Sequence, residues 1–326
     1  MQGSRWRGMA LLLGLAALAQ AQQPTLSDLG PAAPVAPSTL TAVQSLIDAG
    51  HWHEAEGALR SYLGENLGEN LGGNDGSAQA HAMLAYTLLR EDEPRESLKE
   101  YNRAAALERP SAGILESVGQ DYVLLGDWTD ADKWTLRAIQ MEPTDADAWY
   151  SLGRIRFSEQ RFGDALSCFQ RVLVLSPRSV KAENNLGLAY EALNQTDAAV
   201  AAYRQAVAWQ EAGPANQMSE QPLLNLAVVL LHRGKLEEAE PLLEKAASLA
   251  PKDSHIHEQL GHLYLQQSDY AGAQREFQEA CRLDPANSGL HFLLGQAYRH
   301  LGRKEQAQAE FAISARLARA GTPKAP

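Results

Sequence analysis

The sequence predicts an all-α fold, a solenoid of about eight stacked helical hairpins. Glycine, alanine and proline each recur with a period of 34 residues, interrupted once by a gap of 40 residues. The glycines are Gly119, Gly153, Gly187, Gly261 and Gly295; the alanines are Ala131, Ala165, Ala199, Ala239, Ala273 and Ala307; the prolines are Pro143, Pro177, Pro251 and Pro285. A unit of this length holds two helices that bury their apolar faces only by stacking on neighbouring units.

Residues 1–21 have the pattern of a secretory signal peptide. Arg5 and Arg7 form a positive start, and the apolar run 9–19 is too short to cross about 30 Å of hydrocarbon. Ala19 and Ala21 are the small residues that signal peptidase needs, so cleavage is expected after Ala21. The protein is therefore expected to be exported, periplasmic or secreted. An uncleaved anchor or a buried helix is the alternative.

Residues 22–38 contain four prolines and are expected to form a Pro/Ala-rich disordered leader. The solenoid is expected over residues 39–320, with two helices in each unit. Trp149, Leu152 and Gly153 recur at helical spacing in a first helix. Each first helix is expected to end at a residue that tolerates positive φ. These residues are Gly50, Gly126, Asn194, Gly234 and Gly302.

Each second helix is expected to stop before a residue that precedes proline, because that residue leaves the α region. The pairs are Glu142-Pro143, Ser176-Pro177 and Asp284-Pro285. The small residues suggest close packing, with Gly153 on a first helix facing Ala165 on the second. Two axes can then approach to about 8–10 Å, and Phe169 fills the space beside that contact.

These residues resemble the tetratricopeptide repeat (TPR) family, whose unit of 34 residues carries a W-x2-L-G-x2-Y…A-x3-F…P pattern. Trp149, Leu152, Gly153, Ala165, Phe169 and Pro177 match it, with Arg156 in place of the tyrosine. The resemblance implies a right-handed superhelical solenoid whose first helices line a concave surface. The units are expected near 36–77, 78–111, 112–145, 146–179, 180–213, 220–253, 254–287 and 288–320, with a disordered tail at 321–326.

Two insertions interrupt the expected array. Residues 64–76 (GENLGENLGGNDG) lie between units one and two, and a six-residue insertion within 212–221 produces the gap of 40 residues. Both are expected to be solvent-exposed loops. A loop that folds over the concave surface is the alternative. The second helix of the last unit is expected at 304–320, where its polar sequence can cap the array.

Charge and cysteine content exclude several classes of protein. The net charge is −11, and −13 without Arg5 and Arg7, so a nucleic-acid partner is not expected. Cys168 and Cys281 are the two cysteines, on second helices of units four and seven. They are too far apart for a disulfide and are expected to be small buried or half-buried thiols. No P-loop, GxGxxG, GxSxG or CxxC motif is present, so catalysis is the less favoured class.

The histidines raise the question of a metal site. His255, His257 and His262 lie close together on one expected helix, but His257 and His262 are five residues apart and face different ways. A site of HExxH type needs two histidines four residues apart. His81, His257 and His291 occupy, in other units, the repeat position that Trp149 has in unit four. They are expected to pack between helices. No metal and no cofactor are expected.

The resemblance implies that ligands contact the first helices on the concave surface. The residues placed there are Tyr150, Arg154, Lys181, Asn184, Asn185, Asn225, Gln259 and His262. Asn185, Asn225 and Gln259 share one phase in three successive units. An amide both donates and accepts hydrogen bonds, so a row of amides can bind the backbone of an extended peptide. An Asn before Leu-Gly can equally be a framework choice, and both interpretations stay open.

The sequence therefore predicts a non-catalytic scaffold of the cell envelope that binds a protein or peptide partner on its concave face. The second hypothesis is a structural subunit of an envelope assembly, such as a secretion, pilus or outer-membrane complex. The third is a metal-dependent hydrolase that uses His255 and His262. No membrane span is expected after signal cleavage. The sequence specifies neither the partner nor the oligomeric state.

Overall fold

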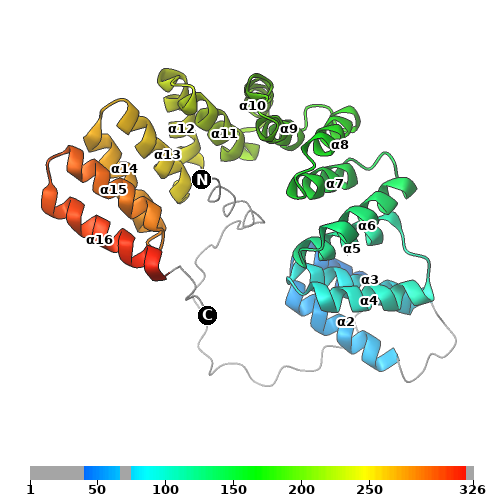
Figure 1. The fold of residues 1–326 in the computed structure, drawn as a ribbon. Coiled ribbons are helices and arrows are strands. Elements are labelled where there is room, and N and C mark those ends of the chain that lie inside the picture. The colour runs from blue at the N-terminus through cyan, green and yellow to red at the C-terminus, as the bar shows by residue number, and fades with distance from the viewer. Residues whose placement is uncertain (1–39, 67–74, 321–326) are drawn as a thin grey trace, which may run out of the picture.

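The computed structural model describes residues 40–66 and 75–320. The expected signal peptide, leader and tail lie outside these residues. Within the described ranges all regular structure is helical, with sixteen α-helices and one short 3-10 helix. Consecutive helices pair into eight hairpins that stack side by side along an open arc (Figure 1). The predicted all-α solenoid of about eight hairpins is therefore confirmed.

The helices follow one another in chain order along the arc. They are α1 (Leu40–Asp48), α2 (Trp52–Asn66), α3 (Asp75–Arg90), α4 (Pro94–Leu107), α5 (Ala112–Leu124), α6 (Trp128–Met141), α7 (Ala146–Ser158), α8 (Phe162–Leu175), α9 (Val180–Ala192), α10 (Thr196–Glu211), η1 (Ala215–Gln217), α11 (Glu220–His232), α12 (Leu236–Leu249), α13 (Ser254–Gln266), α14 (Tyr270–Leu283), α15 (Ser288–His300) and α16 (Lys304–Ala320). In Figure 1, α7, α9 and α11 lie toward the inside of the arc, and α8, α10 and α12 lie toward its outside. The first helices thus form an inner wall.

A polar residue begins each first helix from α5 onward. Ser111, Asp145, Ser179, Ser219, Asp253 and Asn287 are the N-caps of α5, α7, α9, α11, α13 and α15. Each side chain accepts a hydrogen bond from a backbone N–H in the first turn, which satisfies a donor that the helix itself leaves free. The caps therefore start each of these helices at the same phase of the repeat.

The turn between the two helices of every hairpin contains one residue with positive φ. In five hairpins this is the glycine or asparagine that the sequence predicts, such as Gly126 at φ 74°. In the other three it is Asp92, Gln160 or Ser268, which were not among the predicted turn residues. The next N–H bonds a carbonyl five residues back, for example Arg161 N to Arg156 O at 2.8 Å. These backbone bonds complete a helix-ending motif that offsets the cost of left-handed backbone in a non-glycine residue.

The second helices end as the prolines predict. Glu142, Ser176 and Asp284 follow the last residues of α6, α8 and α14, with ψ between 78° and 83° rather than in the helical range. Each is followed by proline, which disfavours helical backbone in the residue before it. The chain then turns into the next first helix within a few residues.

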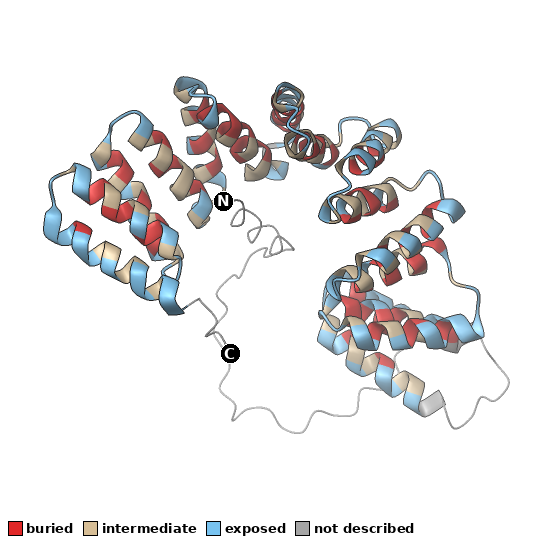
Figure 2. Ribbon diagram, viewed as in Figure 1, coloured by how far each residue is buried: buried red, intermediate tan, exposed pale blue. Residues whose placement is uncertain are grey.

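The side chain nearest to four of the inner-wall glycines is an aromatic ring rather than the predicted alanine. Gly153 lies closest to the ring of Phe169 rather than to Ala165, and a Cβ on Gly153 would stand 2.6 Å from that ring. The same relationship joins Gly187 to Tyr203, Gly261 to Phe277 and Gly295 to Phe311. The aromatic ring lies over the glycine because its side chain extends across the gap that the small residue leaves. Buried residues accordingly follow the faces where helices meet (Figure 2).

Both expected loops are partly helical. Helix α2 extends to Asn66 and α3 begins at Asp75, so the loop expected at 64–76 is shortened from both ends, and residues 67–74 lie outside the described part. The six-residue insertion lengthens α10 to 16 residues, against 14 in α8 and α12, and adds the turn Ala215–Gln217. The exposed connection is therefore shorter than the sequence suggests.

Histidines join the two helices of three hairpins. Nδ1 of His81, His257 and His291 lies 2.6, 2.8 and 2.7 Å from the carboxylates of Glu100, Glu276 and Glu310. Nε2 of His257 and of His291 also lies 3.2 Å from the carbonyl oxygen of a proline six residues earlier. Trp149 Nε1 donates to the equivalent carbonyl of Pro143 at 3.0 Å. These histidines therefore pack between helices, as predicted.

Apolar residues form a series of clusters rather than one central core. The largest in the described part joins α10, α11, α12 and α13, and it includes Tyr203, Leu223, Leu243 and Ile256. It bridges the insertion before α11, so the array continues without a break in its apolar packing. None of the described helices combines the length and the apolar character that a transmembrane span requires.

Candidate functional site

The residues predicted to contact a ligand lie on four successive inner-wall helices. Tyr150 and Arg154 are on α7, Lys181, Asn184 and Asn185 on α9, Asn225 on α11, and Gln259 and His262 on α13. Arg154 and Lys181 are exposed, Asn184 is buried, and the others are half-buried. Three of these helices, α7, α9 and α11, lie toward the inside of the arc (Figure 1).

A row of hydrogen bonds links neighbouring inner-wall helices, and it follows one rule. The fifth residue of one helix bonds the sixth residue of the next. Ser151 Oγ donates to Glu116 Oε1 at 3.1 Å, Asn185 Nδ2 donates to Tyr150 Oη at 2.8 Å, and Asn225 Nδ2 donates to Asn184 Oδ1 at 2.9 Å. The partners are 35, 35 and 41 residues apart, and the last separation includes the six-residue insertion. We call this set the cross-repeat row.

The cross-repeat row changes the roles of the predicted amides. Asn225 and Asn185 each use one amide hydrogen to reach the preceding unit, which leaves one N–H and the side-chain oxygen for another partner. Asn184 is buried and holds Asn225, so it positions that amide rather than facing a ligand. Gln259 is different, because the fifth residue of α11 is the buried, apolar Leu224. The three amides predicted to be equivalent therefore differ. Asn185 and Asn225 are hydrogen-bonded to the preceding unit, whereas Gln259 takes no part in the cross-repeat row.

On α13 a carboxylate lies between two histidines. Glu258 is 3.4 Å from His255 Nδ1 and 3.8 Å from His262 Nε2. Burial alone would raise the pKa of Glu258, but the two histidines outweigh burial and lower it to about 2. The bond to Glu258 raises the pKa of His255, against the opposing effect of burial. His255 and His262 bind opposite oxygens of one carboxylate, so they face the same anion rather than a shared metal position.

Two surface depressions are lined by none of the predicted contact residues. One is lined by Glu93, Pro94, Arg95, Glu96 and Leu125, and the other by Arg109, Pro110, Leu115, Trp134, Arg137, Gln140 and Met141. The predicted contact residues are spread over four helices, an arrangement that suits an extended segment rather than a small molecule.

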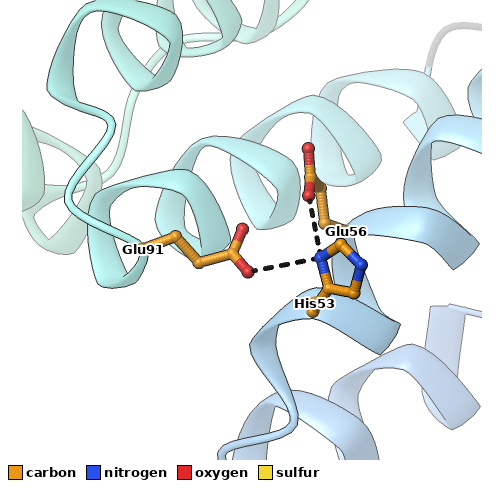
Figure 3. Close-up of side chains that lie close together, drawn as sticks. All are labelled: His53, Glu56 and Glu91. Carbon is orange, nitrogen blue, oxygen red and sulfur yellow. Dashed lines mark ion pairs between the residues drawn. The ribbon is translucent and has the colours of Figure 1, made fainter.

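A group at the N-terminal end of the described array could hold a metal ion. His53, Glu56 and Glu91 bring three ligand atoms within 4.8 Å of one another (Figure 3). Residue spacing along one helix does not reveal this group, because Glu91 comes from a different hairpin than His53 and Glu56. Their sequence signal is weak, since Glu56 and Glu91 are 35 residues apart.

Three segments of the chain match models of the tetratricopeptide repeat family, at residues 156–216, 219–286 and 264–319. BBSome complex member BBS4 of Xenopus tropicalis is 27% identical over 142 residues, which cover 44% of this chain and 26% of BBS4. The chain thus spans about a quarter of the length of that relative. The uncharacterized protein y4yS of Sinorhizobium fredii is 30% identical over 148 residues, which cover 45% of this chain and 76% of y4yS.

Solved structures of the same architecture superpose on most of the chain. The APC/C hetero-tetramer Cut9-Hcn1 has a TM-score of 0.58 at 17% identity, covering 86% of this chain and 52% of that one. A tetratricopeptide repeat protein from Parabacteroides merdae has 0.57 at 18% identity, covering 76% and 94%. PilW, described as a widely conserved type IV pilus biogenesis factor, has 0.56 at 20% identity, covering 66% and 94%. These likenesses show the solenoid fold.

Proposed function

This chain belongs to the tetratricopeptide repeat family, and we propose that it is a non-catalytic scaffold of the cell envelope that binds an extended peptide segment of a partner protein on its inner wall. Repeats of this family generally serve as scaffolds without catalysis. The envelope location rests on the signal-peptide pattern of residues 1–21. N-terminal sequencing of the mature protein should begin at Gln22, and a start at Met1 would contradict export by cleavage.

The observation that carries the proposal is the cross-repeat row. The bonds of Asn185 to Tyr150 and of Asn225 to Asn184 fix the orientation of two amides before any ligand arrives. A fixed amide loses little side-chain entropy on binding, so its remaining N–H and oxygen can bond a peptide backbone at low cost. Arg154 and Lys181 stand exposed on the adjacent turns. They add positive charge, which favours a segment that carries acidic side chains.

Site-specific photo-crosslinking tests the inner wall directly. A photoreactive residue at Arg154 or Lys181 should capture the partner in the envelope fraction, since both side chains are exposed on inner helices. The matched control is Gln170, which is exposed on the outer helix α8. With the captured protein identified and purified, the double variant Arg154→Ala, Lys181→Ala should bind it at least tenfold more weakly. Capture from Gln170 alone, or unchanged affinity of the double variant, would contradict inner-wall binding.

A structural subunit of an envelope assembly is the second candidate. The names of similar proteins favour it, because BBS4 and the Cut9-Hcn1 tetramer are parts of complexes and PilW is a pilus biogenesis factor. In that case the outer helices or the helix edges would dock, and substitutions there would abolish co-purification of the assembly. Reversing surface charges on α8 and α10 should then abolish co-purification, whereas reversing charges on α7 and α9 should not.

A metal-dependent hydrolase that uses His255 and His262 is the remaining alternative. Its test is a substitution of both histidines in the purified protein, followed by a screen for hydrolysis with added Zn²⁺. Metal-dependent hydrolysis that disappears in the double variant would overturn the scaffold proposal. Equal background rates of hydrolysis in the unaltered protein and the double variant would support the scaffold proposal.

A further inference from the structure

Three side chains with metal-ligating atoms meet where the first hairpin packs on the second. His53 and Glu56 lie one turn apart on α2, and Glu91 follows the last residue of α3. Nδ1 of His53 is 3.7 Å from Oε2 of Glu56 and 3.9 Å from Oε1 of Glu91, and all three side chains point toward one another (Figure 3). We propose that this group, the α2–α3 site, binds one divalent transition-metal ion and that its donors suit Zn²⁺.

The two donor distances at His53 are close to those that an ion of this size requires. Zn²⁺ binds nitrogen and oxygen ligands at about 2.0–2.2 Å, which places neighbouring ligands of a tetrahedral site roughly 3.4 Å apart. The donors here are spaced only a few tenths of an ångström wider around His53. The His53 side chain is 93% exposed, so its ring can turn to close that difference without disturbing the core. One imidazole and two carboxylates leave room for water at the fourth position.

The two segments that carry the ligands are held against each other by their neighbours. Trp52 precedes His53 and Arg90 precedes Glu91, and the Arg90 guanidinium lies over the Trp52 ring at 5.2 Å. Trp52 also meets Tyr86 edge-on, with ring centroids 6.2 Å apart. The distance between α2 and the end of α3 is therefore set by aromatic packing rather than by the ligands themselves. Such preorganisation reduces what the ion must order when it binds.

A hydrogen bond from a neighbouring side chain orients Glu56, as commonly happens to carboxylates that bind metal ions. Arg60 Nε donates to Oε1 of Glu56 at 2.7 Å, which leaves Oε2 directed at His53. A hydrogen bond to the distal oxygen of a ligating carboxylate fixes the lone pairs of the proximal one. Arg60 also adds one positive charge to the surroundings, so the affinity should be lower than that of a site with two unopposed carboxylates.

The carboxylates are crowded in a way that a cation would relieve. Glu56 and Glu91 are about one-fifth exposed, and the negative charge of Glu93 acts on Glu91 as well. Arg60 already pairs with Glu56, so a divalent ion would chiefly balance the charge of Glu91, on which the negative charges of Glu56 and Glu93 both act. The ion would also join α2 of the first hairpin to the end of α3 in the second, and so fasten the terminal hairpin to the array.

Zn²⁺ alone, titrated into the untagged protein by calorimetry, tests the α2–α3 site. We expect one ion per chain, and an affinity at least tenfold lower in His53→Ala and in Glu91→Gln. Cys168 and Cys281 are buried and should not compete. The matched control is His51→Ala, since His51 is also exposed near the start of α2 but pairs with Glu54, at 3.6 Å. It should bind Zn²⁺ as the unaltered protein does.

A second readout separates binding at the α2–α3 site from binding elsewhere. Zn²⁺ should raise the melting temperature of the unaltered protein and of His51→Ala, but not that of His53→Ala. Circular dichroism should show His53→Ala folded, because its side chain lies in solvent. No stoichiometric Zn²⁺ binding, or equal binding by His53→Ala, would overturn the proposal and leave His53 as an ion-pair partner of the two carboxylates. Loss of binding in His51→Ala would overturn it as well, by placing the ion elsewhere.

Discussion

The side-chain amide of Asn225 donates a 2.9 Å hydrogen bond to the side-chain oxygen of Asn184, one repeat earlier in the chain. The bond ties α11 to α9 across the insertion that lengthens α10. Asn184 is buried, so its oxygen has little access to water if Asn225 is removed. A residue predicted to contact a ligand therefore also supports the array, and binding and stability must be measured separately.

Substitution of Asn225 by Ala should lower the free energy of unfolding by about 0.5–1.5 kcal/mol, because the bond is lost and Asn184 is left without this partner. Urea denaturation at neutral pH measures the difference. Gln259→Ala is the control at the same phase. The partner position there is the apolar Leu224, so the control should leave stability almost unchanged. Equal losses in the two variants would contradict the cross-repeat row.

Gly187→Ala should destabilise the protein by about 1–3 kcal/mol through overpacking. A Cβ there would stand less than 3 Å from the Tyr203 ring, which is fully buried and donates its hydroxyl hydrogen to Glu191 at 2.7 Å. Gly57→Ala is the matched change in open space on α2, and it should stabilise by about 0.5–1 kcal/mol. Thermal melts of both variants show whether each substitution raises or lowers the stability. A loss of stability in Gly57→Ala, or none in Gly187→Ala, would refute the packing.

Stability should fall as pH rises because of Asp121. This side chain is fully buried on α5, and burial raises its pKa to about 7 although Ser97 donates a 2.7 Å hydrogen bond to it. The folded state then holds a proton that the unfolded state, with a pKa of 3.8, has released. The contribution is complete below pH 4 and is lost as pH rises to about 7. Between pH 5 and pH 8 the loss is about 2–3 kcal/mol.

Asp121→Asn removes this titration while keeping the shape of the side chain. Urea denaturation at pH 5 and pH 8 should show a smaller pH dependence in the variant than in the unaltered protein. The variant should also be the more stable of the two at pH 8. Identical pH dependence would mean that Asp121 is charged in the folded protein across this range.

Glu258→Gln should lower the pKa of His255, because the carboxylate at 3.4 Å is the main cause of its upward shift. Proton NMR titration of the His255 ring measures the change. The raised pKa stabilises the folded protein below about pH 6.5, and that contribution disappears as pH rises through the folded value. An unshifted His255 titration in the variant would contradict the pairing.

The fold was predictable because its signal repeats. A period of 34 residues in glycine, alanine and proline located the hairpins, their turns and the ends of the second helices. The same period also marks Asp92, Gln160 and Ser268 as turn residues. They were not predicted because residues other than glycine seldom adopt positive φ. The spacing of residues in the sequence could not predict that Phe169 lies closer to Gly153 than Ala165 does. Side-chain rotamers decide which neighbour lies over a small residue.

The candidate site was only partly predictable. The family resemblance placed Asn185, Asn225 and Gln259 on the inner wall, but it treated them as equivalent. Their difference depends on the residue 35 positions earlier, or 41 across the insertion, which a single phase of the repeat does not show. The α2–α3 site was missed for the same reason, because Glu56 and Glu91 meet across two hairpins. The bonds of the cross-repeat row join residues one position further apart than the repeat itself.

The apolar cluster across α10, α11, α12 and α13 has a consequence for how the chain folds. In stacked arrays each unit gains stability mainly from its neighbours, so the block with the most continuous packing forms a nucleus from which order propagates. Growth would proceed outward in both directions from these four helices. The last helix, α16, buries only Ala307 among its described residues and should join late and fray first.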